Sequence, residues 1–349
     1  MELAERLEQE RSLPLSGYQY LIENRTSESA AYLAERAVCA RRRVYGNHVY
    51  VRGLIEISNI CKNDCLYCGI RRSNRSCERY RLTAEEILEC CGEGWRLGFR
   101  TFVLQGGEDA AFTDDILCAL VRDIKRLYPD SAVTLSLGER SRDSYERLFA
   151  AGADRYLLRH ETADEAHYKS LHPPEMSYLS RMECLHVLKE IGYQTGCGFM
   201  VGSPRQTMEN LAQDLKFVEK FQPDMCGIGP FIPHAATPFR HEAAGSVELT
   251  CFLLSLIRLI HPRVLLPATT ALGTLDADGR EKGILSGANV VMPNLSPPSV
   301  RKKYELYNNK LCTGDETAQA LAQLAARMRR IGYEIVTSRG DVKKEACQV

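Results

Sequence analysis

The stretch VRGLIEISNICKNDCLYCGI, residues 51–70, joins an apolar run to a loop that carries three cysteines. Residues 51–58 are rich in β-branched and aliphatic side chains, which is typical of a buried strand. Cys61, Cys65 and Cys68 follow in the spacing C-x3-C-x2-C. The pattern predicts a strand whose carboxyl end leads directly into a group of thiols, and residues 61–68 are called the cysteine loop below.

Seven more apolar runs follow, separated by amphipathic stretches with helical periodicity. The predicted strands are residues 51–58, 101–107, 132–138, 155–161, 195–202, 225–232, 263–270 and 289–294. Eight β-α units of about 30 residues favour an α/β fold, a complete (βα)8 TIM-type barrel. An open doubly wound sheet is the weaker alternative because it would have to accept several extra units.

Three segments are expected along the chain. Residues 1–49 form an N-terminal helical segment, whose last helix begins at a serine cap and ends near Gly46. Residues 50–315 form the barrel. Residues 316–349 form a C-terminal helix followed by a polar tail that we expect to be mobile.

Composition excludes several classes of protein. The 349 residues carry 45 basic and 45 acidic side chains, so no overall field attracts nucleic acid or an anionic membrane. The first residues lack the basic and apolar regions of a secretory signal. The most apolar later run, residues 251–260, is too short to span a bilayer. We therefore expect a cytoplasmic protein that binds neither nucleic acid nor membranes.

The cysteine loop stands apart from the other cysteines, most of which, such as Cys118 and Cys184, occupy apolar helix positions as small core residues. Structural zinc needs four ligands, and no second pair follows the loop. A disulfide would leave an odd thiol and is not expected in the cytosol. A redox pair of Cys65 and Cys68 would leave Cys61 idle. The remaining interpretation is a [4Fe-4S] cluster with three thiolate ligands, whose fourth iron is open to S-adenosylmethionine (SAM).

Polar residues stand at the carboxyl ends of several predicted strands, where barrel enzymes keep their chemistry. They include residues 105–109, Arg159, Glu161, Thr269 and Thr270. Arg159 beside Glu161 on a buried strand requires a partner or a ligand. A salt bridge between barrel layers is one explanation, and a polar chamber for a charged small molecule is the one we favour.

The cysteine loop, with an aromatic residue before its last cysteine, is similar to the signature of the radical SAM superfamily. Longer motifs resemble, within it, the HydE family of [FeFe]-hydrogenase maturases: LQGGED (104–109), DRYLLRHETA (154–163), MVGSPRQT (200–207), GIGPFIPH (227–234) and PATTALGT (267–274). The resemblance runs from about residue 50 to residue 310. Methylornithine synthase is the next most similar family, and biotin synthase is more distant.

The resemblance implies an enzyme that cleaves SAM reductively to a 5'-deoxyadenosyl radical. It also implies a role in assembly of the [FeFe]-hydrogenase diiron subcluster, on a cysteine-bound Fe(CO)2(CN) complex. The implied partners are a reductant protein of the flavodoxin or ferredoxin type and, transiently, the other hydrogenase maturases. An amino-acid mutase like methylornithine synthase and a non-catalytic iron-sulfur carrier remain the alternatives.

The resemblance also implies roles for individual residues. Cys61, Cys65 and Cys68 hold the cluster, and the cofactor is bound by Tyr67, Gln105, Gly106, Gly107, Glu108, Ser136, Glu161 and Arg181. Glu161 accepts hydrogen bonds from the ribose, and Arg181 clamps the methionine carboxylate. A plain tight turn at Gly106 and Gly107, and a solvated helix charge at Arg181, are the alternatives.

The implied substrate chamber consists of Thr134, Arg159, Met225, Thr269, Thr270, Met292, Tyr304 and Tyr307. A cationic Arg159 surrounded by hydroxyls suits a carboxylate. Without the resemblance, Met225 and Met292 would be interpreted as core residues.

A single cluster is expected. Some members of the family carry a second cluster on cysteines that follow the eighth strand. Here Cys312 is not followed by a C-x2-C pair.

Overall fold

The computed structural model describes residues 2–311 and 317–343. Its strands are β1 (His48–Val51), β2 (Gly53–Ser58), β3 (Thr101–Gly106), β4 (Ala132–Ser136), β5 (Arg155–Leu157), β6 (Gln194–Cys197), β7 (Met200–Val201), β8 (Met225–Cys226), β9 (Gly229–Pro230), β10 (Val290–Val291) and β11 (Glu334–Val336). Its helices are α1 (Glu2–Glu10), α2 (Leu15–Glu23), α3 (Ser27–Tyr45), α4 (Ala84–Arg96), α5 (Asp114–Leu127), α6 (Arg142–Ala150), α7 (Glu165–Leu171), α8 (Tyr178–Ile191), α9 (Met208–Phe221), α10 (Val247–Ile260), α11 (Thr270–Leu275), α12 (Gly279–Leu285), α13 (Pro298–Arg301) and α14 (Thr317–Arg330).

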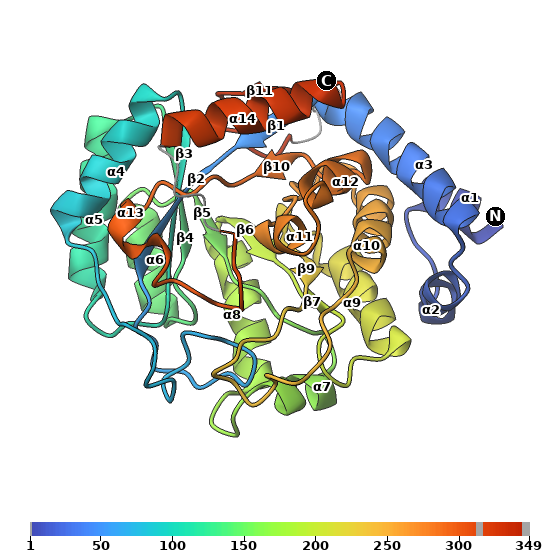
Figure 1. Cartoon of the computed structure of the whole chain (residues 1–349), viewed down its shortest axis with the longest axis horizontal. Coiled ribbons are helices and arrows are strands. Elements are labelled where there is room, and N and C mark those ends of the chain that lie inside the picture. The colour runs from blue at the N-terminus through green and yellow to red at the C-terminus, as the bar shows by residue number, and fades with distance from the viewer. Residues whose placement is uncertain (1, 312–316, 344–349) are drawn as a thin grey trace.

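The strands close into a ring surrounded by helices (Figure 1). Six parallel strands form one sheet in the order β2-β3-β4-β5-β6-β8. Parallel bridges between Met225 and Leu265, and between Pro267 and Val290, continue the ladder. A further bridge from Leu54 to Asn294 returns it to β2. The predicted (βα)8 barrel is thereby confirmed.

Several barrel strands are shorter than predicted. Pro267 lacks an N–H, so it cannot donate to a ladder, and the predicted strand 263–270 pairs only through isolated bridges. The fifth and sixth strands are each divided in two, at Gly198 and Gly227. A Cβ atom on Gly198 would lie 2.0 Å from the carbonyl oxygen of Gly227, so only glycine permits the two strands to approach this closely.

The N-terminal helices α1 to α3 lie outside the barrel helices α9 and α10 (Figure 1). The expected serine cap of α3 is wrong, because the hydroxyl of Thr26 accepts the hydrogen bond from the Ser29 amide. Gly46, at φ +61°, ends this helix as predicted.

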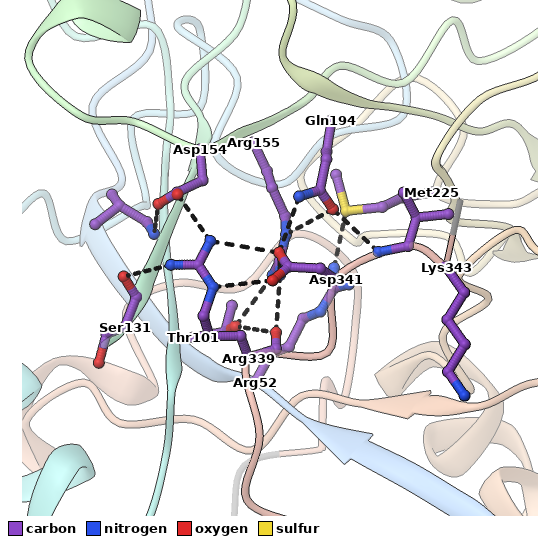
Figure 2. A network of polar contacts seen from close by, with 12 residues as sticks. Arg52, Thr101, Ser131, Asp154, Arg155, Gln194, Met225, Arg339, Asp341 and Lys343 are labelled. Atoms are coloured by element: carbon purple, nitrogen blue, oxygen red, sulfur yellow. Dashed lines mark hydrogen bonds and ion pairs between the residues drawn. The ribbon is translucent and has the colours of Figure 1, made fainter. Parts of the chain in front are cut away.

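The C-terminal segment closes the amino-terminal end of the barrel, which we call the base. Strand β11 pairs in parallel with β1, and Asp341 then reaches the buried Arg155, with 2.6 Å between Oδ1 and Nη2 (Figure 2). Residues 336–343 of the tail that we expected to be mobile thus make defined contacts at the base, because a buried guanidinium needs a carboxylate. Residues 344–349 lie outside the described part of the chain.

In the part of the chain that the structure describes, no helix combines the length and the apolar character needed to cross a membrane.

Candidate functional site

The cysteine loop leaves the carboxyl end of β2, and two arginine side chains bind the loop and the residues on either side of it. Arg71 forms two hydrogen bonds to the carboxylate of Asp64, at 2.8 and 2.7 Å. The Arg79 guanidinium donates to four carbonyl oxygens, among them those of Asn59 and Ile70. These hydrogen bonds fix the loop at Asp64 and fix the chain on both sides of it.

The three thiols of the loop are suited to a cluster. Burial raises the pKa of Cys65 to about 12 and also raises the pKa values of Cys61 and Cys68. Among residues 2–311 and 317–343, no three His, Cys, Asp or Glu side chains surround a position for one metal ion. A [4Fe-4S] cluster binds each cysteine through a different iron, so three separated thiols fit it where a single ion does not.

Gly107 brings the end of β3 against the cysteine loop. A Cβ atom at this position would lie 2.3 Å from the carbonyl oxygen of Ile60 and 2.7 Å from Cβ of Cys61. The Lys62 amide donates to the carbonyl oxygen of Glu108 at 3.0 Å. The glycine therefore has a packing role at the loop, while Gly106 is less crowded, with its nearest atoms at 3.3 Å.

Glu108 uses its carboxylate within the protein. Its Oε1 accepts from the Glu139 amide at 3.1 Å, and its Oε2 lies 2.9 Å from the Lys62 ammonium. The neighbouring Gln105 donates to the hydroxyl of Tyr304 at 3.3 Å and is in register with Ser136 on β4.

Arg181 is buried, which excludes the solvated helix charge that we considered for it. Its Nε donates to Glu139 at 2.6 Å, and its Nη1 donates to the carbonyl oxygen of Arg159 at 2.8 Å. The charge of Arg181 lowers the pKa of the Cys65 thiol, although burial has the larger, opposite effect. Helix α8 thus carries a positive charge to the cysteine loop.

Tyr67 and Glu161 complete this side of the site. The Tyr67 hydroxyl lies 3.3 Å from Nε2 of His172. Burial, followed by the charges of Glu161 and the loop thiols, raises the pKa of Tyr67 well above its ordinary value. Glu161 has φ +67° and lies at the bridge to Phe199. The predicted cofactor residues therefore gather around the cysteine loop.

Several polar atoms in the barrel interior have no hydrogen-bond partner among the described residues. They are Thr134 Oγ1, Arg159 Nε and Nη2, Glu161 Oε2 and Thr269 Oγ1. Arg159 Nη2 and Glu161 Oε2 do lie 3.2 Å apart, so an ion pair exists, but it leaves the other atoms unsatisfied. Buried polar atoms are normally paired, so this set fits a polar ligand.

Thr269 and Thr270 occupy different positions at the start of α11, and Thr270 is the first residue of that helix. Thr269 occupies the N-cap position of that helix and makes no capping bond. Its hydroxyl is therefore available to the barrel interior.

Tyr304 and Tyr307 lie on a segment, residues 302–311, that contacts the residues on either side of the cysteine loop. The Gly69 amide donates to the carbonyl oxygen of Leu306 at 2.8 Å, and Asn59 Nδ2 donates to that of Lys303 at 2.7 Å. Burial raises the pKa of Tyr307 to about 12. The segment thus places both tyrosines at the carboxyl end of the barrel.

The two predicted methionines lie deeper. Met225 and Met292 belong to an apolar cluster with Leu265 and Val290. Met225 Sδ accepts from Arg52 Nη1 at 2.8 Å in the network at the base (Figure 2). The structure therefore separates Met225 from the cysteine loop and gives it the core position considered above.

Sequence reasoning missed a buried ion pair inside the barrel. Glu56 on β2 is fully buried, and it pairs with the Lys310 ammonium and accepts from Asn294 Nδ2 at 2.9 Å. Lys310 also donates to the carbonyl oxygen of Tyr304 at 2.8 Å. The sequence did contain an indication of this ion pair, because Glu56 is the single acidic residue in the apolar run GLIEIS.

Comparison with known proteins gives one family match and several relatives. A family described as "Radical SAM superfamily" matches residues 55–218. The [FeFe] hydrogenase maturase subunit HydE of Thermotoga maritima is 44% identical over 292 residues, which cover 84% of this chain and 83% of that protein. The 3-methylornithine synthase of Methanosarcina barkeri is 28% identical over 315 residues, which cover 90% of this chain and 87% of that protein.

Solved structures agree with the barrel. The crystal structure of methylornithine synthase (PylB) has a TM-score of 0.83 at 25% identity and covers 96% of this chain and 97% of its own. The structure of HydG, a maturase of the [FeFe]-hydrogenase, has a TM-score of 0.79 at 19% identity, with coverages of 96% and 75%. The second likeness is one of fold alone.

Proposed function

Because this chain belongs to the HydE family of the radical SAM superfamily, we propose that it is a radical SAM enzyme acting in assembly of the [FeFe]-hydrogenase diiron subcluster. One observation supports this above the others. Three thiols and no fourth lie on a loop beside a barrel interior whose polar atoms lack partners. That arrangement suits a cluster with one open iron next to a chamber for a charged substrate.

Cys61, Cys65 and Cys68 would hold one [4Fe-4S] cluster, and SAM would complete it. When bound and reduced, the cluster and SAM supply a 5'-deoxyadenosyl radical. The protein's contribution is to place the cofactor and the substrate and to exclude water. A flavodoxin or ferredoxin type of reductant and transient contacts with the other hydrogenase maturases, all in the cytoplasm, complete the proposal.

The cofactor side would use the residues around the cysteine loop. Oε2 of Glu161, which lies 3.2 Å from Arg159 Nη2 but accepts no hydrogen bond, would accept hydrogen bonds from the ribose. Arg181, fixed by Glu139, would attract the methionine carboxylate. The backbone of residues 105–108 would receive the methionine amino group, with Tyr67 beside the adenine and Ser136 nearby.

The substrate side would use the unpaired atoms of the interior. Arg159 Nε and Nη2, with the hydroxyls of Thr134 and Thr269, would bind the carboxylate of a cysteine-bound Fe(CO)2(CN) complex. Tyr304 and Tyr307 would cover the chamber, since the segment that carries them is hydrogen-bonded to Gly69 and Asn59 on either side of the cysteine loop.

The experiment is anaerobic reconstitution with iron and sulfide, followed by incubation with dithionite and SAM. We expect the wild-type protein to bind iron and release 5'-deoxyadenosine, and Cys65→Ala to do neither. Cys77→Ala is the matched control, because Cys77 is half-buried near the loop but outside its motif. Intact iron content and cluster absorbance in Cys65→Ala would contradict the assignment. A cluster without any 5'-deoxyadenosine would indicate a carrier protein.

Methylornithine synthase is the second candidate, because its solved structure matches 96% of this chain. Incubation with lysine and SAM separates the two functions. Formation of methylornithine from lysine would favour the mutase, and conversion of the iron complex alone supports the maturase.

A further inference from the structure

A buried polar pair lies on the outer side of the barrel wall, behind the predicted cofactor site. His160 and Asp214 are both fully buried, and 3.2 Å separates Nε2 of the imidazole from Oδ1 of the carboxyl group. The ring of His160 contacts Phe199 and Phe217. The pair has no role in the proposed chemistry, so its place in an apolar layer needs another reason.

The hydrogen bonds determine which nitrogen of His160 carries the proton. The Gly198 amide lies 3.3 Å from Nδ1 and donates to it, so Nδ1 is the acceptor and Nε2 is the donor to Asp214. Burial lowers the pKa of His160 to about 3, in agreement with a neutral ring. His160 thus connects the fifth barrel strand, through Gly198, to helix α9, which carries Asp214.

Asp214 also binds the backbone beyond Glu161. Its Oδ1 accepts from the Ala163 amide at 2.6 Å, while Oδ2 has no partner among residues 2–311 and 317–343. Oδ1 of Asp214 therefore binds both His160, directly before Glu161, and the amide of Ala163, two residues after it.

Glu161 between these two points has an uncommon backbone conformation. Its φ of +67° lies in the left-handed region, which residues other than glycine, asparagine and aspartate rarely adopt. Its amide donates to the Gly198 carbonyl at 3.0 Å, and its own carbonyl accepts from the Met200 amide at 3.3 Å. Such strain persists only where the surrounding structure imposes it.

We infer that His160 and Asp214 are positioning residues that hold Glu161 in its left-handed conformation, so that its carboxylate is presented to the ribose of SAM. This rests on the proposed function for the identity of the ligand. Two apolar side chains of similar volume would avoid the cost of burying polar groups. They could not, however, make the hydrogen bonds to Gly198 and Ala163 that His160 and Asp214 make.

The test measures SAM affinity of the reconstituted holoenzyme by anaerobic calorimetry, together with iron content and thermal midpoint. We expect Asp214→Leu to raise the Kd for SAM by about tenfold, as loss of supporting hydrogen bonds does at ligand sites. Asp214→Asn keeps an oxygen acceptor and should bind within about twofold of wild type. His160→Leu places an apolar side chain among the rings of Phe199 and Phe217 and should raise the Kd for SAM as Asp214→Leu does. This second variant tests the inference if Asp214→Leu fails to fold.

Asp224→Leu is the matched control. The Asp224 carboxylate accepts from the Thr195 amide at 2.8 Å at the base of the barrel, so its loss should destabilise the fold without changing SAM affinity. A folded His160→Leu or Asp214→Leu protein with full iron and wild-type affinity overturns the inference. A crystal structure of His160→Leu in which the φ of Glu161 is unchanged would also overturn the inference, without any measurement of SAM binding. A wild-type holoenzyme that binds no SAM would instead refute the proposed function.

Discussion

At the scale of single residues, the space around Gly107 controls the shape of the cysteine loop. The substitution Gly107→Ala places a methyl group 2.3 Å from the Ile60 carbonyl, so the backbone of the loop must move. We expect this variant to lose most of its iron after reconstitution, measured by iron and sulfide analysis. Gly227→Ala is the control, because the nearest atom to its Cβ lies at 3.8 Å. A Gly107→Ala protein with full iron would show that the loop tolerates the displacement.

The ion pair of Glu56 and Lys310 gives a second residue-scale prediction. Glu56→Leu leaves the ammonium of Lys310, whose side chain is 10% exposed, without its carboxylate. We expect the free energy of unfolding, measured by urea denaturation, to fall by about 3 kcal/mol.

The double variant Glu56→Leu, Lys310→Met is the control for this pair, because replacing both charges by apolar groups removes the unpaired ion. It should recover most of the lost stability. If the single and double variants are equally unstable, the loss comes from packing and not from the unpaired charge.

At the scale of elements, the C-terminal segment supplies charges that the barrel itself lacks. Arg155 on β5 is fully buried, and Asp341 beyond β11 accepts hydrogen bonds from it and from Gln194 (Figure 2). Arg339 joins this network through Asp154, with 2.9 Å between Nη2 and Oδ1. The base is therefore held together by hydrogen bonds between the C-terminal segment and residues at the start of the barrel strands.

This network predicts a pH dependence. Burial raises the pKa of Asp341, but hydrogen bonds from Arg339 and Gln194 and the charge of Arg155 outweigh it and hold that pKa below its ordinary value. A carboxyl group of this kind stabilises the fold above its unfolded pKa, about 4, and loses this contribution as the pH falls below that value. We expect Asp341→Asn to cost about 1 kcal/mol at pH 7, a small value because the carboxylate is 38% exposed.

The measurement is urea denaturation of wild-type and Asp341→Asn protein, both freed of iron by chelation, at intervals between pH 7 and pH 3. The stability difference should be constant above about pH 5 and shrink below about pH 4. A difference that grows on acidification would contradict the assigned pKa direction.

At the scale of the whole molecule, a closed barrel separates two polar regions. The cysteine loop and its neighbours occupy the carboxyl end, and the arginine network occupies the base (Figures 1 and 2). Barrel enzymes divide in the same way, with chemistry at one end and stability at the other. Substitutions at the base are thus expected to change stability more than SAM cleavage.

One cluster per chain is the corresponding whole-molecule prediction. Anaerobic reconstitution should give about four irons per chain, since one [4Fe-4S] cluster has three cysteine ligands in the loop. Iron and sulfide analysis on the purified protein measures this. A value near eight would require a second cluster, and Cys312, whose role is open, lies outside the described residues.

The barrel and the loop could be predicted because their signals are local. Each predicted strand falls on a barrel position, although glycines and Pro267 shorten the pairing at three of them. The contacts of residues 336–343 could not be predicted, because the polar composition of the tail gives no indication of the buried Arg155 that it contacts. Glu56 was overlooked because a single acid in an apolar run does not reveal its partner.

The residue order was sufficient for the family and for the proposal of the cluster ligands, since three cysteines within eight positions lie on one short loop. Only the closed barrel decides which distant charges meet. Glu56 and Lys310 are 254 positions apart, Arg155 and Asp341 are 186 apart, and His160 and Asp214 are 54 apart. Such pairs depend on strand register and ring closure, which no short stretch of sequence encodes.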